Sequence, residues 1–184
     1  MVRDVSCKNA IYSGYWWLRG DEQLGKSLNF IVCPLELKDV TQKQGERLSV
    51  YDELGREIYH EDAISFSGID QQSVLDQNSS QLIIRSVNYG GSGRFFKVLD
   101  YKDKKVVDLT DDVDTSYDGF AEIVPQFQKE SGVSNVPFQI FLTSSLFNPP
   151  LYTRVIRYIN GRYVKIGEFP RKEVALFMET QIRK

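Results

Sequence analysis

The chain has 184 residues, of which 41% are hydrophobic and 26% charged, a composition typical of a folded globular protein. Its formal net charge of -2 excludes a basic surface for nucleic acid, and no apolar run approaches the roughly 18 residues of a membrane helix. We expect a single domain over residues 1–184 that binds no nucleic acid and does not span a membrane.

The N-terminal part contains the only two cysteines, Cys7 and Cys33. A disulfide between them would close a loop of about 26 residues and stabilise the fold by ~3 kcal/mol in the chain-entropy model. The alternative is a pair of buried thiols, since free cysteine is among the most buried residue types. With His60 as the single histidine, a zinc site lacks ligands, and we interpret His60 as a solvated side chain at a strand end.

Between the cysteines lies a dense aromatic segment, Tyr15-Trp16-Trp17. Neighbouring side chains of a strand point to opposite faces, so we expect one tryptophan to be buried and the other exposed. An exposed tryptophan beside Tyr15 and Arg19 would suit a sugar or a protein partner. The alternative is that both faces of the strand are covered.

Three segments further along the chain, 47–59, 95–109 and 152–166, alternate apolar and polar residues around a turn signal. The expected turn centres are Leu54-Gly55, Lys102-Asp103 and Asn160-Gly161, which recur at roughly 50 to 60 residues, a spacing typical of β repeats. Further strands are expected at 81–88, 122–126 and 137–143. The pattern predicts a mainly β fold of antiparallel hairpin repeats.

Helix is expected only in the tail. Over 170–184, apolar residues recur at helical spacing after Pro170, which predicts a C-terminal helix that covers one end of the sheets. The loop around 148–151 is expected to be exposed and is a second candidate contact surface.

An acidic loop follows the second hairpin. Asp114, Ser116 and Asp118 place oxygen ligands at alternate positions, Gly119 permits a sharp turn, and Glu122 follows three residues later. Calcium takes six to eight oxygen ligands from such loops. The sequence therefore offers Asp114, Ser116, Asp118 and Glu122 as calcium ligands, and the alternative is a turn stabilised by its own hydrogen bonds.

The segment DTSYDGFAEIV, residues 114–124, resembles the D-x-[DNS]-x-D-G-x-x-E-[IL]-V loop of FG-GAP and VCBS-type repeats in integrin-like β-propellers. The resemblance implies propeller-blade-like units over about 48–168, with the loop leading from an outer hairpin into the next unit. Three units are too few to close a propeller. An open curved meander, a piece of an oligomeric assembly and a sandwich therefore remain alternatives.

We expect a non-enzymatic β-rich binding module that contacts a protein or a carbohydrate. The resemblance and the two cysteines together imply a place outside the cytoplasm, periplasmic or secreted, and calcium is the one cofactor indicated. Two alternatives from other classes are a small carbohydrate hydrolase with paired carboxylates and an inhibitor that inserts a loop into an enzyme's cleft.

Overall fold

The protein consists of three antiparallel β-sheets. The computed structural model describes residues 7, 9–18, 26–35, 45–75, 79–87, 94–118, 120–125, 138–143, 152–170 and 173. All thirteen elements within these residues are strands. Among the described residues, no helix is long and apolar enough to cross a membrane.

Each sheet is built from four consecutive strands in up-and-down order. Sheet A contains β1 (Tyr12–Trp17), β2 (Ser27–Leu35), β3 (Gly45–Tyr51) and β4 (Glu57–Ala63). Sheet B contains β5 (Ser65–Gln72), β6 (Gln81–Val87), β7 (Arg94–Lys102) and β8 (Lys105–Asp108), and the short β9 (Ser116–Tyr117) pairs with β7. Sheet C contains β10 (Phe120–Pro125), β11 (Phe138–Thr143), β12 (Tyr152–Ile159) and β13 (Arg162–Pro170).

The mainly β, antiparallel prediction is confirmed. The three predicted hairpins are β3–β4, β7–β8 and β12–β13, so each one supplies the last two strands of one sheet. The strands expected at 81–88, 122–126 and 137–143 correspond to β6, β10 and β11. Neither β2 nor β5, whose sequence SFSGIDQQ alternates weakly, was expected as a strand, and the two-residue β9 lies where a loop was expected.

One turn differs from the prediction by a residue. The β7–β8 turn is centred on Asp103 and Lys104, whose φ angles are 52° and 61°, rather than on Lys102-Asp103. Asp103 and Lys104 therefore have the left-handed backbone conformation of a type I′ turn. The β12–β13 turn lies at Asn160-Gly161 as predicted, with φ of 52° and 90°.

The C-terminal helix expected over 170–184 is not supported. Pro170, expected to begin the helix, is the last residue of β13. The remainder of the expected helix, apart from Glu173, lies outside the described residues, as do Gly119 and the loop around 148–151.

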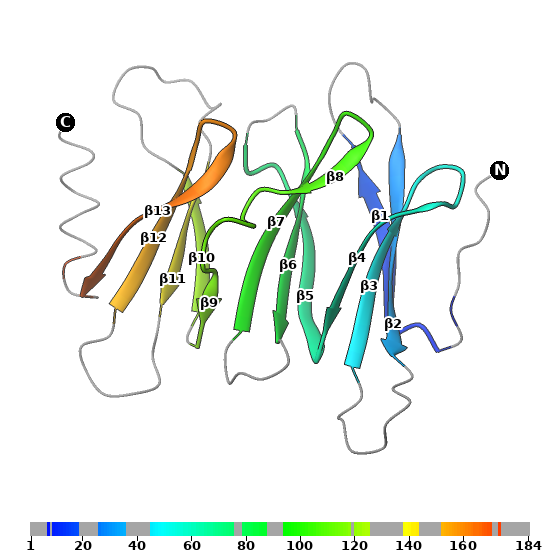
Figure 1. Ribbon diagram of the computed structural model, residues 1–184, viewed down its shortest axis with the longest axis horizontal. Helices are drawn as coiled ribbons and strands as arrows, with labels where there is room; N and C mark the ends of the chain where they lie inside the picture. Colours follow the sequence, from blue (N-terminus) through cyan, green and yellow to red (C-terminus); the bar gives the residue numbers. More distant parts are fainter. Residues whose placement is uncertain are drawn as a thin grey trace.

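The sheets pack face to face, with sheet B between the other two (Figure 1). One apolar cluster joins sheets A and B and contains Trp16, Phe30, Leu48, Ile84 and Leu99. The other joins sheets B and C and contains Ile83, Phe96, Ile140, Ile156 and Tyr163. Sheet B is therefore buried on both faces, which explains the nearly continuous apolar run of β6.

A candidate binding surface on strand β1

Strand β1 presents two adjacent tryptophans in opposite environments. Trp16 is fully buried between sheets A and B, and its Nε1–H donates a hydrogen bond to the carbonyl oxygen of Ser80 at 2.8 Å. Trp17 is 54% exposed. This is the alternation expected of neighbouring residues on a strand, and it gives Trp16 a structural role.

Tyr15 and Trp17 form an exposed aromatic pair on the outer face of sheet A, the face turned away from sheet B. Tyr15 is 58% exposed, and its ring centroid lies 5.9 Å from that of Trp17. Opposite them on β2 lie Asn29, across from Tyr15, and Ser27, across from Trp17. Two apolar rings are therefore flanked by side chains that can donate and accept hydrogen bonds.

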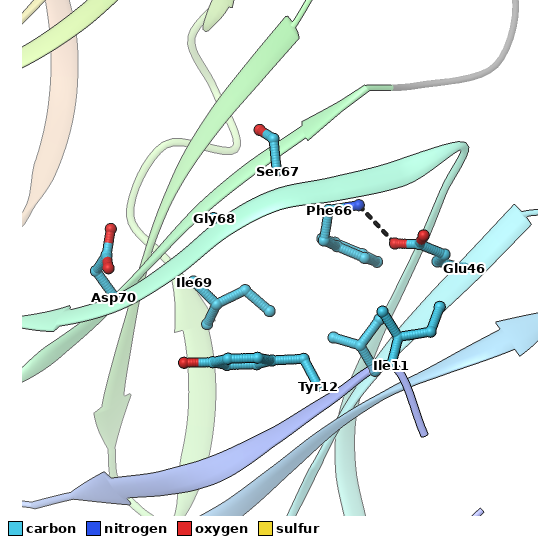
Figure 2. Close-up of a pocket in the computed structure, with 9 residues that line it drawn as sticks. Ile11, Tyr12, Glu46, Phe66, Ser67, Gly68, Ile69 and Asp70 are labelled. Atoms are coloured by element: carbon cyan, nitrogen blue, oxygen red, sulfur yellow. Dashed lines mark hydrogen bonds between the residues drawn. The ribbon is translucent and has the colours of Figure 1, made fainter. Parts of the chain in front are cut away.

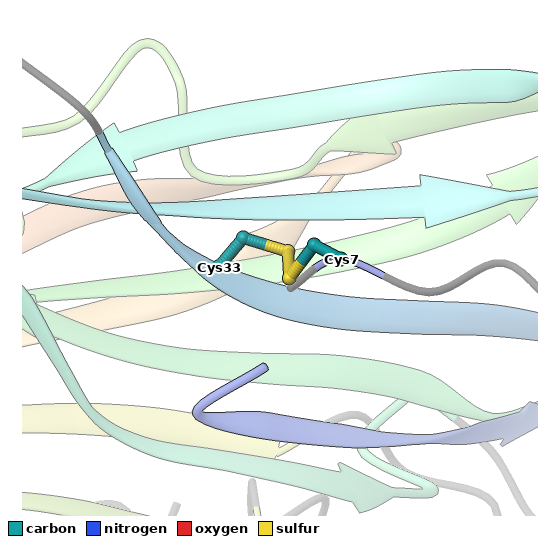
Figure 3. Close-up of a disulfide and its surroundings, with 2 residues drawn as sticks. All are labelled: Cys7 and Cys33. Carbon is teal, nitrogen blue, oxygen red and sulfur yellow. A yellow bond between two sulfur atoms is a disulfide. The ribbon is translucent and has the colours of Figure 1, made fainter. Parts of the chain in front are cut away.

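Cys7 and Cys33 form a disulfide on this outer face (Figure 3). Their Cα atoms are 6.3 Å apart. Cys33 shares the face with Asn29 because the two residues are four positions apart on β2. The disulfide thus fixes the N-terminal arm at Cys7 to the same sheet face that carries the aromatic pair.

The backbone of Trp17 is held by a side chain from sheet B. Its N–H donates to Oε1 of Gln71 at 3.0 Å, and its carbonyl oxygen accepts from Nε2 of Gln71 at 2.9 Å. The amide of Gln71 thus occupies the place of a peptide group on a neighbouring strand. Nothing in the sequence marks this glutamine, because its partner is 54 residues away.

The expected calcium ligands are only partly brought together. Oδ1 of Asp114 accepts hydrogen bonds from the backbone N–H and the hydroxyl of Ser116, at 2.9 and 2.6 Å. Burial opposes the ionisation of Asp114, but these bonds and the charge of Arg154 outweigh it and hold its pKa below the ordinary value.

The cation beside this loop is an arginine. Nη1 of Arg154 lies 3.0 Å from Oδ2 of Asp114 and donates to the carbonyl oxygens of Asp114 and Ser116 at 2.6 and 3.3 Å. On its other side, Nε of Arg154 lies 3.0 Å from Oε1 of Glu168. We refer to Arg154, Asp114, Ser116 and Glu168 together as the Arg154 clamp.

Glu122 and Arg154 lie on opposite faces of sheet C. Arg154, Leu142 and Ala121 are opposite one another across β12, β11 and β10, so they share one face, and Glu122 points the other way. Among the described residues, no group of three or more His, Cys, Asp or Glu side chains converges as a metal site.

A cleft between sheets A and B tests the hydrolase alternative. It has a volume of about 570 Å³, lies between the β3–β4 and β7–β8 turns, and contains Asp52, Glu53 and Asp103. Burial raises the pKa of Asp52, but hydrogen bonds from Arg56 and the N–H of Leu54 outweigh this and hold its pKa below the ordinary value. Asp52 therefore shapes the turn and is a poor general acid.

The carboxyl groups elsewhere follow the same trend. Within the described part of the chain, the carboxyl groups whose pKa departs from the ordinary value all have a lowered pKa, held down by arginine, lysine, serine or backbone donors: Asp52, Asp62, Asp114 and Glu168. A glycosidase acid requires a raised pKa, so these groups do not favour the hydrolase. His60 is exposed, and its Nδ1 lies 2.9 Å from Oε1 of Glu57.

No known family model matches the chain, and neither a curated protein nor a solved structure is significantly similar to it. The resemblance to FG-GAP and VCBS repeats therefore rests on the residues of the 114–124 loop.

Proposed function

We propose that the protein is a non-enzymatic binding module whose partner contacts the aromatic pair Tyr15–Trp17. The observation that carries this proposal is the exposure of both rings on the edge strand of sheet A, next to a tryptophan that is fully buried. Exposed aromatic side chains on a rigid strand lose little conformational entropy on binding and contribute strongly at interfaces. The partner is a protein or a carbohydrate, since flat rings beside Asn29 and Ser27 suit both.

Trp17 provides the readout for a test. Because Trp16 is buried and Trp17 faces solvent, a partner that covers the pair should shift mainly the long-wavelength part of the tryptophan emission. Fluorophore-labelled protein would be applied to a glycan array and to a peptide array, and each hit would be titrated by intrinsic fluorescence.

The variants are Tyr15→Ala and Trp17→Ala, and Tyr152→Ala, which alters an exposed aromatic residue of sheet C, is the matched control. We expect both β1 variants to weaken binding at least tenfold and the control to leave it unchanged. Binding that survives both β1 substitutions would reject this surface.

We further propose that each sheet corresponds to one propeller-blade-like unit. Two features support this: the shared up-and-down strand order and the position of the acidic loop, which leads from the β7–β8 hairpin to β10, the first strand of sheet C. Light scattering would show whether the chain, with its three units, is a monomer or assembles with further copies of itself.

Calcium binding by Asp114, Ser116, Asp118 and Glu122 stays a prediction of the sequence. Calcium at Asp114 would compete with Arg154, which already binds this carboxylate. Thermal unfolding in 1 mM calcium and in chelator, for the wild type and Asp118→Ala, tests it. A micromolar site would raise the melting temperature by several degrees in the wild type alone. Equal melting temperatures in calcium and in chelator would indicate that the loop is an ordinary turn held by Arg154.

Placement outside the cytoplasm is also a proposal, and the Cys7–Cys33 disulfide supports it, because structural disulfides persist in oxidising compartments. Reduction should lower the free energy of unfolding by about 3 kcal/mol. Urea unfolding with and without reductant measures this, and Cys7→Ser/Cys33→Ser serves as the control that reductant should not affect.

A further inference from the structure

A second cleft separates strand β1 from strand β5, and Figure 2 shows the residues that line it. Its volume is about 310 Å³, and its apolar lining consists of Ile11, Tyr12, Val32, Phe66 and Ile69. Phe66 and Ile69 extend from β5 toward Ile11 and Tyr12, whereas Ser67 points away. Ile11 and Tyr12 are 53% and 50% exposed, so the walls of this cleft are incompletely covered.

One carboxylate of the lining has no cationic partner among the described residues. Oε2 of Glu46 accepts the backbone N–H of Phe66 at 2.7 Å (Figure 2), and Glu46 forms no ion pair within the part of the chain that the structure describes. The other acid of the lining, Asp70, is paired with Arg85. Glu46 thus gives an apolar cleft an uncompensated negative charge.

The open edge of β1 faces the same cleft. The two hydrogen bonds from Gln71 to the backbone of Trp17 show that this edge is turned toward β5. Backbone groups repeat their direction every second residue, so the N–H and C=O groups of Ser13 and Tyr15 point the same way. Among the described strands β1 pairs with β2 alone, and these groups are therefore available to an added strand.

We propose that this cleft binds an extended peptide segment that pairs with the open edge of β1 and places an arginine or lysine side chain beside Glu46. The edge supplies main-chain hydrogen bonds to any extended peptide, as in strand addition to other sheets. The apolar walls accommodate the aliphatic part of a long basic side chain, and Glu46 selects its charge.

This site is separate from the Tyr15–Trp17 surface. The aromatic pair projects from the outer face of sheet A, whereas the cleft uses the strand's edge, the inward-facing Tyr12, and Glu46. The two proposals can therefore fail independently. Variants that block the edge leave both rings in place.

The test uses four fluorescein-labelled hexapeptides of sequence Val-Thr-Val-Xaa-Val-Thr, with Xaa as Arg, Lys, Leu or Glu. Fluorescence anisotropy measures their binding to the full chain. We expect the Arg and Lys peptides to bind at least tenfold more tightly than the Leu and Glu peptides. N-methylation of alternate amides in the Arg peptide should abolish its binding, because a methylated amide cannot donate to the edge.

Two substitutions in the protein, each with a control substitution, test the residues that we expect to contact the peptide. Glu46→Gln keeps a hydrogen-bond acceptor for Phe66 and removes the charge, so we expect tenfold weaker binding of the Arg peptide. Glu57→Gln, on the outer face, is the control and should have no effect. Ser13→Pro removes an edge N–H that β2 does not use and should block binding, whereas Ser13→Ala should not.

Light scattering and circular dichroism of each variant complete the experiment. Failure of all four peptides to bind, or binding that Glu46→Gln and Ser13→Pro leave unchanged, would overturn the proposal. A wild-type dimer that Ser13→Pro converts to a monomer would also overturn it, because the edge would then belong to a second copy of the chain.

Discussion

The two junctions between sheets differ in where their polar and charged groups lie. Between sheets A and B, the buried Trp16 donates across the interface to Ser80, and the amine of Lys97 lies 2.7 Å from Glu61 and 3.3 Å from Asp108. Both clefts described above also open at this junction.

The junction between sheets B and C has an apolar centre, and the acidic partners in its ion pairs are more exposed than Glu61 and Asp108. Arg154 binds Asp114 and Glu168, and Arg162 binds Asp112, with both Arg162 and Asp112 more than half exposed. The same strand order therefore supports two kinds of interface. The two described clefts lie at the junction that contains the Lys97 ion pairs, and this is where we place peptide binding.

The largest effect expected from this comparison concerns Trp16. Trp16→Ala should lower the free energy of unfolding by about 3–5 kcal/mol, because it leaves a cavity between sheets A and B and a buried carbonyl oxygen without its donor. Trp17→Ala should change it by less than about 0.5 kcal/mol. Urea unfolding followed by circular dichroism measures both, and similar losses would contradict the assignment of Trp16 to the core.

A smaller effect is expected from Lys97, whose side chain is 25% exposed. Lys97→Met leaves Glu61 and Asp108 without their cation and should cost about 2 kcal/mol. Arg162→Met removes an exposed ion pair at the other junction and should cost less than about 0.5 kcal/mol. Urea unfolding of both proteins compares them. Equal costs would show that the polar groups of the two junctions do not differ in burial.

Acid should weaken the junction between sheets B and C through the Arg154 clamp. Hydrogen bonds from Ser116 and the charge of Arg154 lower the pKa of Asp114, and hydrogen bonds from Lys165 and Arg154 lower the pKa of Glu168. Below about pH 4 the unfolded chain therefore binds protons before the folded one does, so the free energy of unfolding falls as pH falls through the lowered pKa values.

Urea unfolding between pH 2 and 6 measures this loss. The dependence should be shallower in Arg154→Met, whereas Arg162→Met should retain the wild-type slope. If the free energy of unfolding of Arg154→Met depended on pH as steeply as that of the wild type, the Arg154 clamp would not contribute to the acid response.

The smallest expected effect concerns Tyr163, one of the aromatic residues buried at the junction of sheets B and C. Its hydroxyl has no hydrogen-bond partner in the described part of the chain. Tyr163→Phe should therefore leave the free energy of unfolding unchanged or raise it by up to about 1 kcal/mol. Trp16→Phe, which deletes a satisfied donor, should lower it. A loss in Tyr163→Phe would indicate that its hydroxyl is hydrogen-bonded in solution.

Much of the fold followed from local patterns. Alternation and turn residues located the three hairpins, because a strand's period and a type I′ turn depend on neighbouring residues alone. The weakly patterned β5 was missed, since its apolar contacts come from Phe66 and Ile69 on either side of a bulge. The turn at Asp103-Lys104 was predicted one residue too early, because no glycine in this segment marks its centre.

Local sequence patterns were sufficient to predict a mainly β chain of repeated hairpins and an alternation at Trp16 and Trp17 in which one ring is buried. The packing of the sheets was needed to establish which tryptophan is buried, that Arg154 reaches the acidic loop, and that Glu46 has no cationic partner among the residues that the structure describes. These outcomes depend on residues that are 64, 40 and 20 positions apart. The period of a strand specifies which side chains share a face, but the packing of one sheet against another specifies what each face contacts.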